Sequence, residues 1–284
     1  MSSSVSFAKL QALGNDFVLV DARQQRFDPD PELIRGLADR RMGIGFDQLL
    51  ILEPPTSEQA LCSVRIRNSD GSAAEQCGNG MRAIALWLNE QGLLHDHGQL
   101  DTDGGPVEIT FQDSQNITAS LAPPVFTPPD SSPLANGRPW QEAIDGERCN
   151  IDYVELGNPH LIVDLAQPPS ASLVADAGAT LTRHPALKHG ANINFAFVTS
   201  QSHVELSVFE RGVGPTPACG SGACATAVSL IRRELVRSPV IIDQPGGRLV
   251  IDWSGRGAQV RMTGPARHVF DGRFVPGHFA QPQP

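Results

Sequence analysis

The chain has 284 residues, of which 31 are acidic and 22 basic, and its net charge of −9 argues against a nucleic-acid-binding protein, which usually presents a basic face. No run of about 18 apolar residues predicts a transmembrane helix, and the first residues lack the basic and apolar regions of a signal peptide. The five cysteines are few and odd in number, which favours reduced thiols in the cytoplasm over a disulfide scaffold. Neither nucleic acid nor a membrane is expected as a partner.

The first half of the chain predicts strands, a short helix, further strands and a longer helix. VSFAKL and FVLVDA alternate as strands do, and a helix is expected over residues 31–41, with proline in its first turn and Gly43 after it. QLLIL and CSVRI are the next expected strands. A second helix is predicted over residues 80–91, where apolar side chains recur at helical spacing before Gly92.

The second half repeats this order, with a helix predicted over residues 222–237 and strands expected in GGRLVIDW and QVRMTG. LGNDFVLVD (13–21) matches LGNPHLIVD (156–164) at five of nine positions, at an offset of 143 residues. EQCGNGMRAIAL (75–86) and PACGSGACATAV (217–228) share Cys-Gly-x-Gly at an offset of 142 residues. Two matches at nearly one offset indicate an internal duplication.

The duplication predicts an α+β protein of two pseudo-symmetric domains. Each is expected to be a curved, mostly antiparallel sheet around a central helix that starts at the cysteine, with the active site in the cleft between the domains. A proline-rich stretch, residues 122–139, marks the boundary. We therefore expect domains at 1–125 and 126–284, with the segment from about 265 to 284 packing back onto the first.

Cys77 and Cys219 each stand directly before a glycine at the predicted start of a helix. A helix N-terminus offers unpaired N–H groups and the positive end of the dipole, which bind a carboxylate and lower the pKa of a thiol. Each Cys-Gly-x-Gly segment is therefore a candidate anion-binding turn with a thiol beside it. Two such turns at one cleft suit removal of a proton from one face of a carbon and delivery to the other, by a thiolate base and a thiol acid.

Other interpretations of the cysteines remain. Taken without its partner, Cys219 could equally be a small buried residue. Zinc-finger spacing and a complete P-loop are absent from the sequence, and a cysteine hydrolase would need one nucleophile rather than two. No metal and no other cofactor is expected. A disulfide between Cys77 and Cys219 could form on oxidation, whereas Cys62, Cys149 and Cys224 are predicted to be structural.

The chain resembles the diaminopimelate epimerase family in the order and content of its motifs, which are LGNDF, GFDQ, NSDGSAAEQCGNGMR, GNPH, ANI, ERGVG, ACGSGACA and TGPA. The resemblance runs from Phe7 to Phe274. It implies a cofactor-independent isomerase that interconverts LL- and meso-2,6-diaminopimelate, a small-molecule substrate, for lysine and peptidoglycan precursor synthesis. It also implies a cytoplasmic homodimer.

The resemblance implies a role for each motif residue. Cys77 and Cys219 are the acid/base pair, supported in catalysis by His160 and Glu210. The implied substrate-binding residues are Gly78, Asn79, Gly220 and Ser221 for the α-carboxylate, Asn15 and Gln48 for the reacting end, and Asn68, Asn158, Asn192, Glu210 and Arg211 for the distal end. Structural roles compete with some of these, because an asparagine after glycine suits a turn and an adjacent Glu-Arg pair suits a surface.

One segment departs from the family pattern. Residues 212–217 read GVGPTP, where the family usually has GAGET, so Pro215 replaces an acid and Pro217 stands two residues before Cys219. We expect the loop to differ rather than the chemistry. The alternatives are a related racemase for proline, hydroxyproline or a basic amino acid, and a non-catalytic phenazine-type or binding relative. The distal-end residues and the two cysteines favour the first interpretation. Which cysteine is the thiolate at rest stays open at this point.

Overall fold

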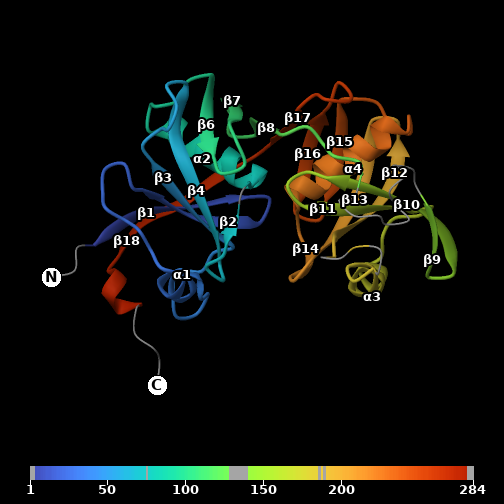
Figure 1. Cartoon of the computed structure of the whole chain (residues 1–284), viewed down its shortest axis with the longest axis horizontal. Coiled ribbons are helices and arrows are strands. Elements are labelled where there is room, and N and C mark those ends of the chain that lie inside the picture. Colours follow the sequence, from blue (N-terminus) through green and yellow to red (C-terminus); the bar gives the residue numbers. More distant parts are fainter. Residues whose placement is uncertain (1–3, 75, 128–139, 185–186, 188–189, 280–284) are drawn as a thin grey trace. The chain divides into compact units, whose positions relative to one another are not determined.

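The computed structural model describes residues 4–74, 76–127, 140–184, 187 and 190–279 (Figure 1). The chain divides into two compact units, Met1–Ala119 with Gly264–Pro284, and Ser120–Thr263. It passes from one unit to the other within β8 (Asn116–Leu121) and returns within β17 (Val260–Gly264). The division lies within β8, earlier than the expected boundary at 125/126, and most of the proline-rich stretch lies outside the described residues.

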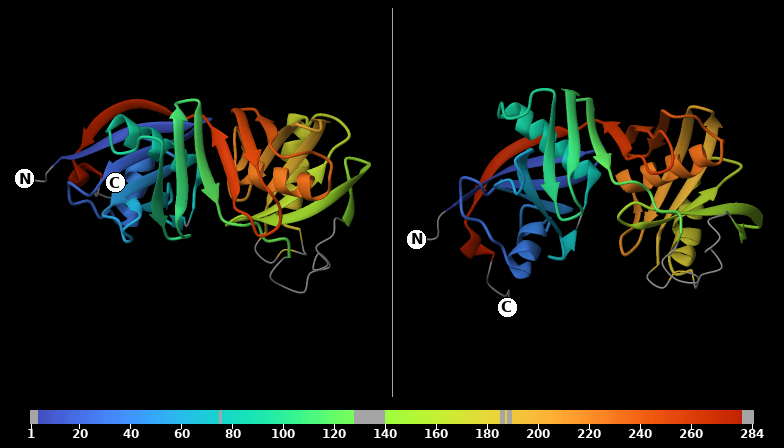
Figure 2. Two further views of the ribbon diagram at one scale, coloured as in Figure 1. Left: turned by 90° about the horizontal axis from the view of Figure 1, so that it is seen from above. Right: turned by 45° about the horizontal axis from the view of Figure 1, so that its top comes forward.

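The first unit contains a mostly antiparallel sheet. Its strands are β1 (Val5–Ala12), β2 (Asn15–Asp21), β3 (Gln48–Glu53), β4 (Ala60–Asn68), β5 (Ala73–Ala74), β6 (His97–Thr102), β7 (Val107–Asp113), β8 and β18 (Arg267–Phe274). The pairs β2–β3 and β4–β6 are parallel, because a helix connects the two strands of each pair. β18 pairs with β1 over most of its length, and the two run side by side in Figure 2.

Helix α1 (Pro31–Ala38) connects β2 to β3 and ends before residue 41, the end expected from the sequence. Asp30 caps its start, because the side chain accepts the N–H of Leu33 at 2.8 Å. At the other end the carboxylate of Asp39 accepts the N–H groups of Arg41 and Met42, each at 2.7 Å. These local bonds offer the backbone an alternative to helix, so the chain turns away there.

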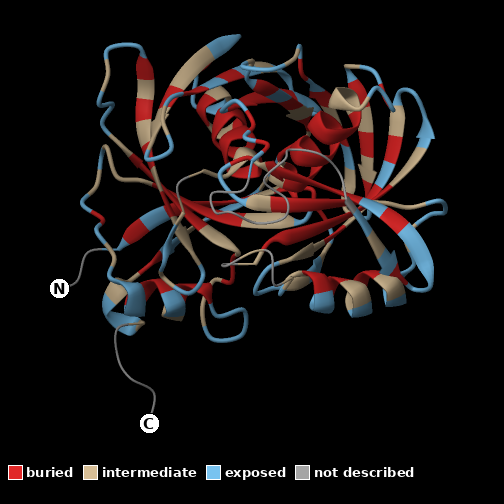
Figure 3. Ribbon diagram, turned by 45° about the vertical axis from the view of Figure 1, so that its right-hand side comes forward, coloured by how far each residue is buried: buried red, intermediate tan, exposed pale blue. Residues whose placement is uncertain are grey.

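Helix α2 (Gly78–Glu90) is buried on nearly every side, as the red ribbon in Figure 3 shows, rather than along a single apolar stripe. It starts before the predicted residue 80 because Cys77 occupies the N-cap position. It ends where Gly92 adopts a φ of 71° and the N–H of Leu93 returns to the carbonyl of Leu88 at 2.9 Å. A helix surrounded in this way holds its N-terminal residues rigidly.

The second unit repeats this arrangement. Its elements are β9 (Trp140–Ile144), β10 (Glu147–Glu155), β11 (Pro159–Asp164), α3 (Ala171–Leu181), β12 (Asn192–Ser200), β13 (His203–Glu210), β14 (Gly214–Thr216), α4 (Gly220–Arg232), β15 (Val240–Gln244), β16 (Gly247–Asp252) and β17. The pairs β11–β12 and β13–β15 are again the parallel ones. The predicted duplication and the α+β fold are therefore confirmed within each unit.

Helix α4 is buried like α2 and also begins earlier than predicted, with Cys219 at its N-cap. It ends at Arg232 rather than at residue 237, because Glu234 adopts a left-handed φ of 59°. The N–H of Leu235 then returns to the carbonyl of Leu230 at 3.0 Å, closing the helix end. A short 3-10 helix, η1 (Pro276–His278), follows β18, and no helix in the described part of the chain is long and apolar enough to cross a bilayer.

Candidate active site

In the first unit, the cysteine motif forms a turn in front of α2. Cys77 is half-buried and lies at the N-cap, where its Sγ accepts the N–H of Gly80 at 3.3 Å. A Cβ on Gly80 would stand 3.2 Å from the Leu50 side chain and 3.4 Å from that sulfur, so a larger residue would press against both. An N–H aimed at the sulfur favours the thiolate over the thiol.

Amide side chains surround this thiol. Asn15 Nδ2 donates to the carboxylate of Asp47 at 2.9 Å, which turns Asn15 Oδ1 toward the motif. That oxygen accepts Asn79 Nδ2 at 3.4 Å and lies 4.0 Å from Cys77 Sγ, a weak contact for a thiol proton. Asn79 is buried, and its own Oδ1 accepts Arg82 at 2.9 Å. The predicted residues Asn15, Cys77 and Asn79 therefore lie together.

An ionic network fixes Asp47 and hence Asn15. The Arg40 guanidinium donates to both Asp16 and Asp47, and Lys9 donates to Asp16 at 2.6 Å. Burial acts to raise the pKa of Asp16, but the hydrogen bonds from Arg40 and Lys9 outweigh it and lower the pKa to about 2. Asp16 is consequently ionised at neutral pH, and it anchors the start of β2.

Gln48 and Asn68 face each other across the β3–β4 pair. Gln48 Nε2 donates to Asn68 Oδ1 at 3.0 Å, and Asn68 Nδ2 donates to Ser72 Oγ at 3.0 Å. Gln48 Oε1 is buried and has no hydrogen-bond partner among the described residues. A buried amide oxygen without a partner is a ready acceptor for a ligand N–H, such as an ammonium group.

In the second unit, Cys219 holds the same place before α4 but in a different environment. It is only 6% exposed, and the Gly222 N–H of the helix, which favours the thiolate, acts against its burial. Its backbone N–H donates to Gln244 Oε1 at 2.8 Å. Burial first, and then the carboxylate of Glu210, raise the pKa of the Cys219 thiol well above its usual range. This environment favours the thiol.

His160 lies behind Cys219 and reaches it through Ser221. Ser221 Oγ is 3.6 Å from Cys219 Sγ and 3.1 Å from His160 Nε2. On the far side of the ring, His160 Nδ1 lies 3.2 Å from Asn194 Oδ1. The ring is fully buried, and this burial lowers the pKa of His160 to about 4. The imidazole is therefore neutral at physiological pH.

The remaining predicted residues of the second unit lie around the end of β13. The Glu210 carboxylate accepts Thr216 Oγ1 at 2.6 Å, and Asn192 Oδ1 accepts the backbone N–H of Arg211 at 2.9 Å. Asn158 differs from these residues, since it is exposed in the turn before β11 and its carbonyl accepts the N–H of Leu156 at 3.1 Å.

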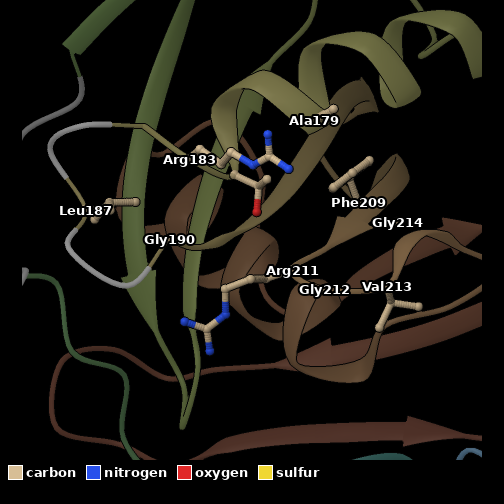
Figure 4. A pocket seen from close by; sticks show the side chains of 10 residues that line it. Ala179, Arg183, Leu187, Gly190, Phe209, Arg211, Gly212, Val213 and Gly214 are labelled. Atoms are coloured by element: carbon tan, nitrogen blue, oxygen red, sulfur yellow. The ribbon is translucent and has the colours of Figure 1, made fainter.

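Arg211 lines a cavity of about 650 Å³ in this unit (Figure 4). The cavity walls come from the end of α3 and the chain after it, and from β13 and the β13–β14 turn, and they include Arg183, Gly190, Phe209 and Val213. Gly190 has a φ of 68°, and a Cβ there would stand 2.4 Å from the Thr182 carbonyl. Two guanidinium groups at one cavity suit an anionic ligand.

The two unexpected prolines lie beside these groups. Pro215 is exposed and pairs with Phe209 in the short strand β14, and Pro217 accepts the N–H of Gly246 at 2.7 Å. Thr216 between them still holds Glu210. The prolines thus shape the approach to α4 and leave the carboxylate of Glu210 in place.

Several residues at these turns were not predicted from the sequence. Asp47 holds Asn15 and Gln244 holds Cys219, each through a single hydrogen bond between segments far apart in the sequence, and no local pattern marks them. Asn194 did carry a signal, because it alternates with Asn192 on one face of a buried strand where apolar residues are the norm. In the part of the chain described by the structure, no group of three or more His, Cys, Asp or Glu side chains is arranged as ligands for a metal ion.

Comparisons with known proteins agree with one another. The sequence model described as diaminopimelate epimerase matches residues 7–127 and 153–269. A protein of Halorhodospira halophila named diaminopimelate epimerase is 42% identical over 272 residues, covering 94% of each chain. A Pseudomonas aeruginosa protein of the same name is 40% identical over 270 residues, covering 94% of this chain and 98% of the relative.

Solved structures share the fold at low sequence identity. A hydroxyproline epimerase from Agrobacterium vitis, solved with trans-4-hydroxy-L-proline, aligns with a TM-score of 0.72 at 17% identity, over 96% of this chain and 93% of that one. A PhzF-family phenazine biosynthesis protein of Bacillus anthracis aligns with a TM-score of 0.69 at 18% identity, over 96% and 99%. At these identities the likeness shows a common fold.

Proposed function

The chain belongs to the diaminopimelate epimerase family, and on this premise we propose that it interconverts LL- and meso-2,6-diaminopimelate by proton transfer between an α-carbon and two cysteines. It is accordingly an isomerase. The observation that carries the mechanism is the pair of buried helices, one per unit, each capped by a cysteine of a Cys-Gly-x-Gly turn. We propose that the two turns act on one substrate molecule.

In this mechanism Cys77, as a thiolate, removes the α-proton from one face of the carbon, and Cys219, as a thiol, delivers a proton to the opposite face. One proton is removed and one is delivered, so Cys77 ends as a thiol and Cys219 as a thiolate. Proton exchange with solvent then restores the starting state before the next turnover in the same direction. Half-burial and the Gly80 N–H support the thiolate at Cys77, and burial beside Glu210 supports the thiol at Cys219.

The substrate α-carboxylate is proposed to sit on the N–H groups at the two helix starts. Gly78, Asn79, Gly220 and Ser221 belong to first turns, whose N–H groups have no carbonyl partner within the helix. Negative charge that develops on the α-carbon and its carboxylate is stabilised by these fixed dipoles. Protein groups alone then supply the chemistry, and no cofactor takes part.

The distal amino acid end is proposed to bind amides and the cavity beside Arg211. The Arg211 guanidinium suits the distal carboxylate, whereas Gln48 Oε1 suits the ammonium group of the reacting end. Asn68, Asn158, Asn192 and Glu210 complete the proposed set. Arg183, on the same cavity, adds to its attraction for an anion.

We also propose a cytoplasmic homodimer that serves lysine and peptidoglycan precursor synthesis. Support for a dimer comes from β18, where Val269 and Phe270 are 56% and 48% exposed on a strand that pairs only with β1 among the described strands. A long edge strand with exposed apolar residues is usually covered by another chain. Sedimentation of Phe270→Asp should show monomers, and an unchanged sedimentation coefficient would remove this support.

An isomerisation assay tests the function. The purified chain is incubated with each candidate substrate separately and without added cofactor. LL-Diaminopimelate should be converted to the meso isomer, with little or no racemisation of L-proline, trans-4-hydroxy-L-proline or L-lysine, as followed by chiral chromatography. Cys77→Ala protein prepared in parallel controls for a contaminating enzyme. Turnover of proline or hydroxyproline without turnover of diaminopimelate would overturn the substrate assignment.

A further inference from the structure

We propose that Asn194 is a positioning residue that fixes which ring nitrogen of His160 carries the proton, and so commits the Ser221 hydroxyl to His160 rather than to Cys219. The consequence is that Cys219 rests as a thiol. The inference rests on the proposed function in taking Cys219 as an acid, but the hydrogen-bond chain from which it follows lies within the second unit and involves no substrate.

The orientation of the Asn194 amide is set from the side of α4. Asn194 is fully buried, and its Nδ2 donates to the Gly222 carbonyl at 2.9 Å and to Thr226 Oγ1 at 3.1 Å. A backbone carbonyl accepts hydrogen bonds and never donates them, so the atom facing Gly222 must be the nitrogen. The carbonyl oxygen Oδ1 is therefore the atom that faces His160, at 3.2 Å from Nδ1.

This orientation determines the tautomer of His160. Asn194 Oδ1 carries no hydrogen, so the hydrogen between it and His160 belongs to Nδ1. The ring is neutral above a pH of about 4, because burial lowers the pKa of His160 to that value. A neutral imidazole protonated on Nδ1 has a lone pair on Nε2, which can only accept a hydrogen bond.

Ser221 is the next member of the chain. Its hydroxyl has a single hydrogen, and the Nε2 lone pair of His160, 3.1 Å away, takes it. No hydrogen then remains for the Cys219 sulfur, 3.6 Å from Ser221 Oγ, so the contact is favourable only when the sulfur donates as S–H. The ionisable groups that face this sulfur are Glu210 on β13 and, through Ser221, His160 on β11. The Glu210 carboxylate also favours the thiol, and together with burial it outweighs the Gly222 N–H, which favours the thiolate.

The first unit lacks this polar chain, so the fold does not require it. By the repeat in LGNDF and LGNPH, Phe17 stands in the place of His160, and it is fully buried. Leu50 stands in the place of Asn194. A Cβ on Gly80 would stand 3.2 Å from the Leu50 side chain, and a Cβ on Gly222 would stand 3.3 Å from the Asn194 oxygen. Two apolar residues in one unit are thus matched by a buried His-Asn pair in the other.

Nitrogen NMR of the full chain, labelled with ¹⁵N-histidine, tests the tautomer without substrate. The chain has 8 histidines, and the His160 signals are those missing from His160→Phe. The wild type should show a protonated Nδ1 and an unprotonated Nε2. Asn194→Leu should shift His160 toward the other tautomer, whereas Thr226→Val, which leaves the Gly222 contact intact, should preserve the wild-type pattern.

Alkylation of Cys219 as a function of pH, followed by peptide mass spectrometry, provides the second readout. Asn194→Leu frees the Ser221 hydroxyl to donate to the thiolate, so the midpoint of the Cys219 profile should fall by about one pH unit, the tenfold effect of roughly one hydrogen bond. Thr226→Val should leave the midpoint unchanged. A wild-type spectrum with Nε2 protonated overturns the proposal, even if Asn194→Leu fails to fold, and so does an unchanged midpoint in a folded Asn194→Leu protein.

Discussion

Cys77 and Cys219 cap equivalent helices in two copies of one fold, yet their surroundings differ in exposure and in hydrogen bonding. Cys77 is half-buried and accepts the Gly80 N–H at 3.3 Å, whereas Cys219 is 6% exposed and lies beside the Glu210 carboxylate, so its burial outweighs the Gly222 N–H that also faces it. Behind Cys77 lie the apolar Phe17 and Leu50, while behind Cys219 lies the polar chain through Ser221 and His160.

The difference shows what a duplicated fold retains and what it is free to change. The helix starts and their glycines are the same in both copies, so the backbone groups suited to a carboxylate are present twice. The side chains behind them differ, and they favour opposite ionisation states of the two thiols. A symmetric pair would give two bases or two acids, whereas transfer across a carbon needs one of each.

Removing either thiol should have the largest effect on activity. Cys77→Ala and Cys219→Ala should each lower kcat for epimerisation by about a thousandfold, within the usual contribution of a general acid or base. Cys224→Ala removes a buried thiol from the body of α4 and should stay within severalfold of the wild type. Substantial activity in either of the first two variants would remove the matching cysteine from the mechanism.

His160→Phe gives the second unit the residue that the first unit has at the equivalent position, Phe17. His160→Phe should lower kcat by about 10- to 100-fold, since the Ser221 hydroxyl is then free to stabilise the Cys219 thiolate. It should also change acid stability. Unfolded His160 binds a proton near pH 6.5 and the folded ring near pH 4, so the wild type loses up to roughly 3 kcal/mol of unfolding free energy as the pH falls between those values.

His160→Phe has no such proton linkage, so this part of the pH dependence should vanish. Chemical denaturation of both proteins across the same pH range measures it. Parallel stability curves for the two proteins would contradict the buried, neutral state of His160.

Arg211 is proposed to bind the distal carboxylate and takes no part in proton transfer by the thiols. Arg211→Gln should raise KM for diaminopimelate by about 10- to 100-fold with a smaller change in kcat, the loss of one charged hydrogen-bonding contact to the distal carboxylate. Arg183→Gln removes the same charge from the same cavity and serves as the matched control. Equal effects of the two substitutions would point to net charge rather than to a contact made by Arg211.

The smallest expected effect concerns the support of Asn15 in the first unit. Asp47→Asn keeps an acceptor for Asn15 but weakens the charged network with Arg40. Activity should fall about fivefold, as expected for roughly 1 kcal/mol of lost orientation. Steady-state kinetics at low and high salt would measure it, and a loss as large as that of Cys77→Ala would give Asp47 a direct part in the chemistry.

The sequence predicted the fold and the two cysteine turns because both leave local or repeated patterns. Strand alternation, helix-stop glycines and two repeats at one offset are visible without coordinates, and the helix starts were misplaced by only one turn or less. The C-terminal ends of α1 and α4 were missed because Asp39 and Glu234 turn the chain through local backbone conformations.

The sequence carried little of the contrast between the two thiols. Exposure of Cys77 and burial of Cys219 depend on packing between strands that are far apart in the chain, as does the contact from Gln244. His160 was identified through the family resemblance, but its partner Asn194 was not. Hydrogen-bond direction, from which the tautomer follows, exists only once three elements are packed together.

The fate of solvent deuterium tests the two-thiol account most directly. LL-Diaminopimelate is incubated with enzyme in D₂O, and substrate and product are separated and analysed at low conversion. If one thiol removes the proton and the other delivers one from solvent, the meso product carries deuterium at one α-carbon while the recovered LL isomer stays unlabelled. Deuterium entering the recovered LL isomer as fast as the meso product would show a single base and contradict the account.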